Sequence, residues 1–109
     1  MSPSIAILSD IHANLPALEA VLADIESQGI RGLLCLGDVV GYGAQPAECI
    51  DLLRARNFTA ILRGNHDAYA ASDDDPTNVS PDTLKGIHWT RARLSPEHRA
   101  WLGALPLTW

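Results

Sequence analysis

The chain has 109 residues and a mass of 11.7 kDa, which is enough for one domain and excludes an (α/β)₈ barrel or a two-domain enzyme. Apolar residues make up 47% of the sequence and charged residues 19%, which is typical of a globular protein and excludes an intrinsically disordered one. The 8 basic residues are outnumbered by 13 acidic ones, and this net charge of −5 argues against a nucleic-acid or anionic membrane partner.

The first half of the sequence repeats one unit: a short apolar run, a polar loop and a helical pattern. The apolar runs cover residues 5–8, 33–36 and 58–62. The first helix has Asn14 in the N-cap position, Pro16 in its first turn and Gly29 as its stop. The second opens at Pro46 and ends near Asn57, where a left-handed cap is expected. Repeated βα units predict an α/β fold with a mainly parallel sheet.

The second half begins with a polar stretch at residues 72–81, which contains three consecutive aspartates. We interpret it as a solvated surface loop rather than a metal site, because adjacent side chains do not converge on one point. Two helices follow, over residues 81–94 and 96–105, with Ser80 and Ser95 as their N-caps. The predicted organisation of residues 1–109 is a core over 1–70, an acidic loop over 71–81 and a helical segment over 82–105.

Signals for export, anchoring and disulfide bonding are missing from the sequence. The first residues lack the layout of a signal peptide, and no apolar run approaches the roughly 20 residues of a membrane span, so a cytoplasmic protein without a membrane partner is expected. Cys35 and Cys49 fit neither a disulfide framework nor metal-binding spacing, and they are predicted to be buried free thiols.

Polar side chains gather directly after each of the three predicted strands. Right-handed crossovers place the carboxyl ends of parallel strands on one edge of a sheet, where ligands bind. The side chains delivered there are those of Asp10, His12, Asp38, Asn65, His66 and, just behind, Asp67. Turn-forming preferences would explain the polarity of these segments, but neither His12 nor the order Asn-His-Asp.

The residue types at this edge suit divalent transition metals. Asp10 and His12 stand two residues apart, so both can bind one ion, whereas Asp38 could bridge two ions and Asn65 could supply an oxygen to the second. Oxygen and imidazole ligands without thiolate suit Mn²⁺, Fe, Co²⁺, Ni²⁺ or Zn²⁺, and we favour manganese. Two such ions, roughly 3.5–4 Å apart, are typical of enzymes that hydrolyse phosphoesters.

Three motifs carry a family resemblance: Asp10-x-His12, Gly37-Asp38-x-x-Gly41 and Gly64-Asn65-His66-Asp67. In this order, after successive strands, they resemble the calcineurin-like metallophosphoesterase superfamily and its small bacterial phosphodiesterase-like branch. The resemblance implies an α/β/β/α sandwich of which this chain carries the first half. It also implies the following roles: Asp10 and His12 bind the first metal, Asp38 bridges both, Asn65 binds the second, His66 contacts the phosphate or protonates the leaving group, and Asp67 orients His66.

Departures from the family pattern refine this expectation. Protein phosphatases carry Asp-Arg-Gly and His-Glu where this chain has Asp38-Val39 and His66-Asp67, which argues against protein phosphatase activity. The family completes its site with later histidines in His-Gly and Gly-His-x-His motifs, and the sequence has neither. The remaining histidines, at positions 88 and 98, are interpreted as helix-face or capping residues. An incomplete second metal site is therefore expected, as if the C-terminal half of the family domain were missing.

Two functions remain open at this stage. The first is a metal-dependent phosphodiesterase in which a metal-bound hydroxide attacks a small phosphoester, and the second is a catalytically inactive fragment or binding module of the same fold. Arg63 could bind the substrate phosphate or be solvated, and Tyr42 could line the substrate cleft or pack on the surface. A half-sandwich would leave one sheet face exposed, which predicts self-association or marginal stability.

Overall fold

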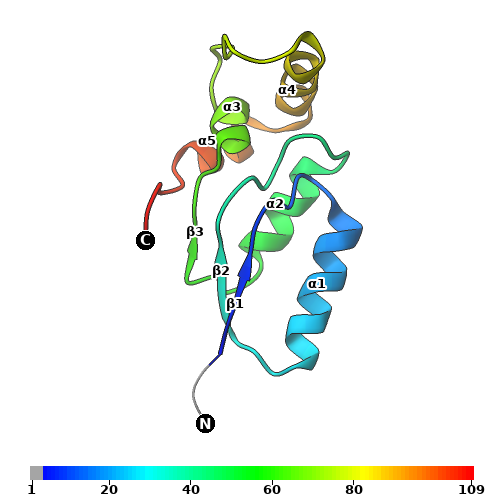
Figure 1. Ribbon diagram of the computed structural model, residues 1–109, viewed down its shortest axis with the longest axis vertical. Helices are drawn as coiled ribbons and strands as arrows, with labels where there is room; N and C mark the ends of the chain where they lie inside the picture. Colours follow the sequence, from blue (N-terminus) through cyan, green and yellow to red (C-terminus); the bar gives the residue numbers. More distant parts are fainter. Residues whose placement is uncertain (1–3) are drawn as a thin grey trace.

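The computed structural model describes residues 4–109 (Figure 1). Along this part of the chain the elements are β1 (Ile5–Leu8), α1 (Leu15–Ser27), β2 (Gly32–Cys35), α2 (Pro46–Arg54), β3 (Ala60–Ile61), α3 (Asn65–Ala71), α4 (Pro81–Arg93) and α5 (Pro96–Gly103). The strands form one parallel sheet in the order β1-β2-β3, which confirms the predicted α/β fold. No helix among the described residues has the length and apolar character that crossing a bilayer would require.

The third strand is shorter than the apolar run that predicts it. Only two residues are assigned to β3, yet pairing with β2 continues on both sides of them. Thr59 donates its backbone N–H to Leu33 at 2.8 Å, and Leu62 donates to Cys35 at 2.9 Å. The hydrogen bonding between β2 and β3 therefore continues to Leu62, just before the segment that contains Asn65 and His66.

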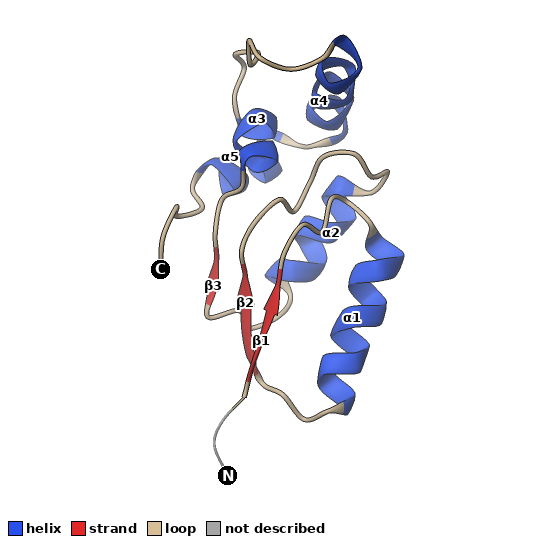
Figure 2. Cartoon of the chain, viewed as in Figure 1, coloured by secondary structure: helices blue, strands red, loops and turns tan. Residues whose placement is uncertain are grey.

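Helices α1 and α2 cover one face of the sheet, and the strands point toward α3 (Figures 1 and 2). Leu22 of α1 and Leu53 of α2 are buried in the core between helices and strands. On the opposite face Ile5, Ile7 and Leu36 are 56%, 63% and 50% exposed. In the described part of the chain this apolar face of the sheet is exposed, as the sequence predicts.

The predicted N-caps are confirmed. Asn14 accepts a hydrogen bond from the N–H of Ala17 at 3.2 Å, and Ser80 and Ser95 cap α4 and α5 in the same way. The predicted left-handed cap at Asn57 is wrong, because α2 ends at Arg54 and its C-cap, Ala55, is right-handed with φ −79°. The sequence pattern does not predict helix α3, because the first residues of this helix belong to a motif that we interpret as a loop.

The acidic loop is exposed but held in place. Arg99 of α5 lies 2.7 Å from Asp73, and Arg91 of α4 lies 2.7 Å from Asp75. His88 also binds Asp75, at 3.0 Å. Hydrogen bonds from Arg91 and then His88 lower the pKa of Asp75. The predicted surface loop is confirmed, and ion pairs additionally tie it to the two helices that follow it.

Both cysteines are free and buried, as predicted. Burial raises the pKa of Cys35 and of Cys49 to about 11. Because the thiolate is the reactive species, we expect neither to react with iodoacetamide at pH 8 in the folded chain, whereas both should react in urea. Intact-mass spectrometry measures the difference. Rapid labelling of the native chain would contradict this burial.

Candidate metal centre

Hydrogen bonds hold the loops after β1 and β2 side by side. Asp10 donates its backbone N–H to the carbonyl of Gly37 at 3.0 Å, and His12 donates to the carbonyl of Asp38 at 2.9 Å. The parallel pairing of the two strands thus continues past their ends. This brings Asp10, His12 and Asp38 together from segments far apart in the sequence.

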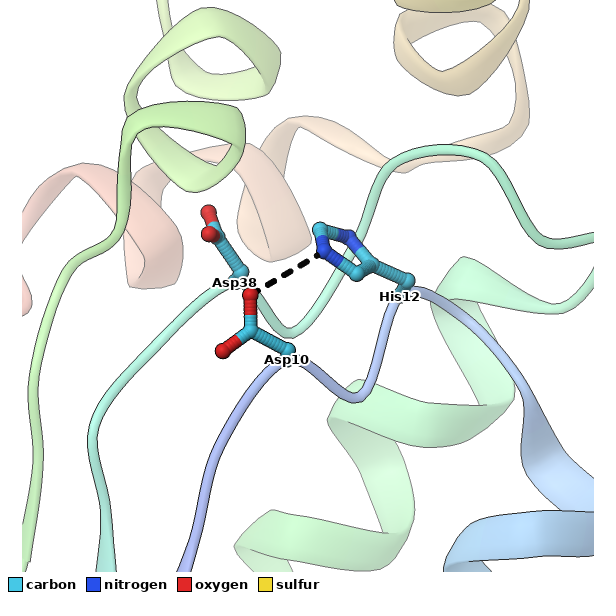
Figure 3. Close-up of side chains that lie close together, drawn as sticks. All are labelled: Asp10, His12 and Asp38. Carbon is cyan, nitrogen blue, oxygen red and sulfur yellow. Dashed lines mark ion pairs between the residues drawn. The ribbon is translucent and has the colours of Figure 1, made fainter.

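Asp10, His12 and Asp38 form a cluster at the carboxyl edge of the sheet (Figure 3). Each offers one ligand atom, and these atoms all lie within 4.8 Å of one another. The three residues have left-handed backbones, with φ of 56°, 48° and 53°. Such a conformation is costly for residues other than glycine, although Asp and His tolerate it better than most, and it recurs at functional sites. A hydrogen bond from Ser9 lowers the pKa of Asp10, and the nearby His12 lowers it further.

The ring of His12 is oriented like that of a metal ligand. Its Nδ1 lies 3.0 Å from the carbonyl oxygen of Val40. A carbonyl can only accept, so Nδ1 carries a proton, and in the neutral imidazole Nε2 presents a lone pair. Nε2 lies 3.4 Å from Oδ1 of Asp10. Metal-binding histidines commonly hold their second ring nitrogen in this way, so the geometry of this cluster fits a divalent cation.

Asn65, the first residue of α3, contacts the same carboxylate. One atom of its side-chain amide lies 3.2 Å from both oxygens of Asp38. With the amide nitrogen in that place, Asn65 would donate two hydrogen bonds. With the amide oxygen there, three oxygens face one another, an arrangement that suits a bound cation. The contact places Asn65 beside Asp38, and the role of Asn65 in metal binding stays a prediction.

His66 lies at the centre of a small aromatic cluster. Its ring centroid is 4.6 Å from that of Tyr42, 5.3 Å from His12 and 5.5 Å from Tyr69. The residue is only 9% exposed, and burial lowers its pKa. The imidazole is therefore neutral at pH 7, with one nitrogen free to donate. The sequence indicates Tyr42 as a candidate but carries no signal for Tyr69, which reaches His66 only because residues 65–71 are helical.

Asp67 binds backbone groups of two segments, and its role in orienting His66 stays a prediction. Its carboxylate is fully buried and accepts four backbone N–H groups, from Gly64, Asp38, Val39 and Val40, at 2.9–3.3 Å. Burial raises the pKa of Asp67, while these donors lower it. Within residues 4–109 the carboxylate forms no hydrogen bond to the His66 ring. Asp67 is a positioning residue that joins the loop after β2 to the start of α3.

Replacing Asp67 with asparagine should strongly destabilise the chain. An amide has one acceptor oxygen, so two of the four N–H groups would face its NH₂ group instead. Buried donors without acceptors cost about 1–3 kcal/mol each, and we expect a loss of about 3 kcal/mol in the free energy of unfolding. Urea denaturation measures it, with Asp73→Asn on the exposed loop as the control. Equal stability of the two variants would contradict this role.

Gly41 provides the space that the His66 ring occupies. A Cβ at this position would lie 2.7 Å from Nδ1 of His66, and the glycine has φ +93°. Gly29 has φ +71°, but a Cβ added there would meet nothing within 4 Å. The cost of the left-handed backbone is about 1–2 kcal/mol in both Gly41→Ala and Gly29→Ala, and only the first also displaces the ring.

We therefore expect Gly41→Ala to unfold at a lower urea concentration than Gly29→Ala. The His66 ring signals should also move in NMR spectra of Gly41→Ala and stay in place in Gly29→Ala. Identical stabilities with an unmoved ring would show that the close approach at residue 41 is unimportant.

Three other candidate residues lie outside the cluster. Arg63 directs Nη1 to the carbonyl of Gly103, at 3.1 Å, at the end of α5. Its contact with a substrate phosphate stays a prediction. His88 binds Asp75 on the acidic loop, whereas His98 caps α5 and binds Asp51 at 2.9 Å. The interpretation of both histidines as helix-face or capping residues is confirmed.

Comparison with known proteins decides the family. A family model for calcineurin-like phosphoesterases matches residues 3–108, almost the whole chain. The chain belongs to the calcineurin-like phosphoesterase family. An uncharacterised protein from Methanocaldococcus jannaschii is 43% identical over 103 residues, which cover 94% of this chain and 42% of that protein.

Solved structures of calcineurin-like phosphoesterases and their relatives share the fold of this chain. A metallophosphoesterase from Sphaerobacter thermophilus is 39% identical, with a TM-score of 0.76 over 97% of this chain and 42% of that one. A hypothetical protein from Pyrococcus horikoshii is 28% identical, with a TM-score of 0.82 over 94% of this chain and 47% of that one. The chain thus spans less than half the length of each relative. The family is divalent-metal dependent, and this chain has a candidate Asp/His/Asp site.

Proposed function

We propose that this calcineurin-like phosphoesterase chain supplies the first metal-binding half of a phosphodiesterase that acts on small phosphoesters, with manganese as the favoured metal. The single observation that carries the proposal is the convergence of Asp10, His12 and Asp38, whose ligand atoms lie within 4.8 Å of one another. The hydrogen bond from His12 Nδ1 to Val40 supports it, because it leaves Nε2 free for a metal.

Each ligand has a distinct part in this proposal. Asp10 and His12 would hold the first ion, Asp38 would be shared, and Asn65 would hold the second. Bound divalent ions would supply Lewis acidity and would lower the pKa of a water molecule bound to them to near neutrality. Among the described residues the second ion would have only Asp38 and Asn65, so this second site would be the weaker one. Asp67 would maintain the geometry through the four N–H groups that it binds.

His66 would interact with the reacting phosphoester. Its ring lies beside His12, and its backbone N–H donates to Oδ1 of Asp38 at 3.0 Å. The imidazole is neutral when nothing is bound, and an anionic phosphate next to it would raise its pKa. His66 would then donate a hydrogen bond to the phosphoryl group and transfer a proton to the leaving oxygen.

A direct assay tests the proposed function. The purified chain is incubated with Mn²⁺ and bis(p-nitrophenyl) phosphate, and nitrophenol release is followed with and without EDTA. We expect turnover that requires the metal. Turnover equal to that of buffer, with metal binding intact, would reject catalysis by this chain and favour the alternative of a binding module.

The partner expectations extend the same proposal. The exposed apolar face around Ile5, Ile7 and Leu36 would bring copies of the chain together, because contiguous exposed apolar surface favours association between proteins. Sedimentation velocity would detect this self-association, and a monomer at every concentration would reject it.

A further inference from the structure

A cavity of about 190 Å³ lies beside the metal centre, between the His66 region and α4. His66 and Tyr42 form one wall, and Ile87 and Thr90 of α4 form another. Figure 1 shows α3 and α4 beyond the carboxyl ends of the strands. None of the roles proposed above uses the α4 side of this cavity.

His66 connects the cavity to the metal centre. Its backbone donates to Asp38, a member of the metal cluster, while its side chain lines the cavity. Tyr42 packs on His66 and on His12, with ring centroids 4.6 and 5.0 Å apart, and lines the same cavity. A phosphoester whose phosphate lay at the metal ligands could therefore extend its organic group past His66 into this space.

The chemistry of the lining restricts what can bind. Ile87 and Thr90 are buried, and Ala70 of α3 adds apolar surface. Asp82 is the only Asp, Glu, Lys or Arg side chain that the described residues contribute to the lining. The lining therefore offers no lysine or arginine to pair with an anionic ligand group. Burying an unpaired negative charge next to Asp82 would be unfavourable.

We propose that this cavity binds the organic group of the phosphoester, and that this group is compact, largely apolar and free of negative charge. The inference rests on the proposed function and extends it to substrate class. The volume of about 190 Å³ is below the roughly 300–1,000 Å³ of pockets for drug-sized ligands. A single ring or a short chain fills such a space.

Gly86 of α4 offers a matched pair of variants. It lines the cavity, and a Cβ at this position would meet nothing within 4 Å. Gly86→Ala should therefore fold at least as well as the parent, since alanine favours a helix interior over glycine. Gly86→Leu should fill part of the cavity. The two variants change the same backbone position and differ in the volume that they occupy.

The first test measures binding by NMR in the absence of metal, using benzyl alcohol and benzoate as probes of similar size. In the parent and in Gly86→Ala, benzyl alcohol should shift the signals of Ile87, Thr90 and residue 86. In Gly86→Leu it should leave these signals unchanged. Benzoate should leave these signals unchanged. Benzyl alcohol shifts that are absent or lie elsewhere would overturn the cavity assignment, and equal shifts from benzoate would overturn the charge restriction.

The second test measures kcat/KM for a methyl and a benzyl ester of p-nitrophenyl phosphate. Gly86→Leu should lower the value for the benzyl ester by at least about tenfold relative to that for the methyl ester, and Gly86→Ala should not. Turnover with an unchanged ratio would overturn the inference and leave the proposed function standing. Absence of turnover in the parent, with the NMR shifts present, would instead reject the proposed function and retain the cavity as a binding site.

Discussion

The Asp38→Asn variant is expected to bind Mn²⁺ at least roughly 100-fold more weakly than the parent and to lose metal-dependent hydrolysis. Substitutions of groups that only orient a metal ligand already cost roughly 10–100-fold in affinity, so loss of a shared ligand should cost no less. Asparagine keeps the shape of Asp38 and can still accept the N–H of His66, which lies 3.0 Å from Oδ1. The fold should therefore survive while the charge is lost.

A matched control is Asp24→Asn, which removes one negative charge from an exposed position on α1. Isothermal titration with Mn²⁺ and the nitrophenyl assay should show no change in this variant. Equal metal affinities for the Asp38 and Asp24 variants would mean that the cluster in Figure 3 does not bind the metal.

The His66→Asn variant is expected to lower kcat by roughly 10²–10⁴-fold, the usual contribution of a positioned acid or base. Its Mn²⁺ affinity should change little, because the His66 ring is not among the three clustered ligand groups. The loss should be larger for esters with poor leaving groups, which need a proton most. The assay compares nitrophenyl and alkyl diesters, and the titration compares metal binding.

His88→Asn provides the control for this variant. His88 is another helical histidine, but it pairs with Asp75 on the acidic loop, away from the cluster. Its loss should leave kcat for both esters unchanged. If the His66 variant lost metal affinity in parallel with activity, or lost equal activity on both esters, then His66 would act on the site's structure rather than on the leaving group.

The fold and the main cluster could be predicted because their signals are local. Apolar runs and capping residues such as Asn14 and Ser80 identify the elements, and parallel topology places residues after β1 and β2 on one edge. The spacing of Asp10 and His12 then predicts shared binding. The sequence pattern does not predict the left-handed backbone conformation of these residues.

The role of Asp67 could not be predicted from local patterns. Its carboxylate binds the backbone of residues 38–40, which are 27–29 positions away along the chain. No periodicity encodes a contact between a side chain and a distant backbone. The same limit explains the acidic loop, where Asp73 and Asp75 are held by arginines of α4 and α5.

The most direct test of the metal centre is paramagnetic broadening of backbone amide signals by Mn²⁺ in the intact chain. We predict that low Mn²⁺ concentrations selectively broaden the signals of residues 9–14, 37–43 and 64–67, and that EDTA or Asp38→Asn abolishes the effect. Broadening centred on the acidic loop at residues 72–75, or broadening that persists in Asp38→Asn, would contradict a metal site built by Asp10, His12 and Asp38.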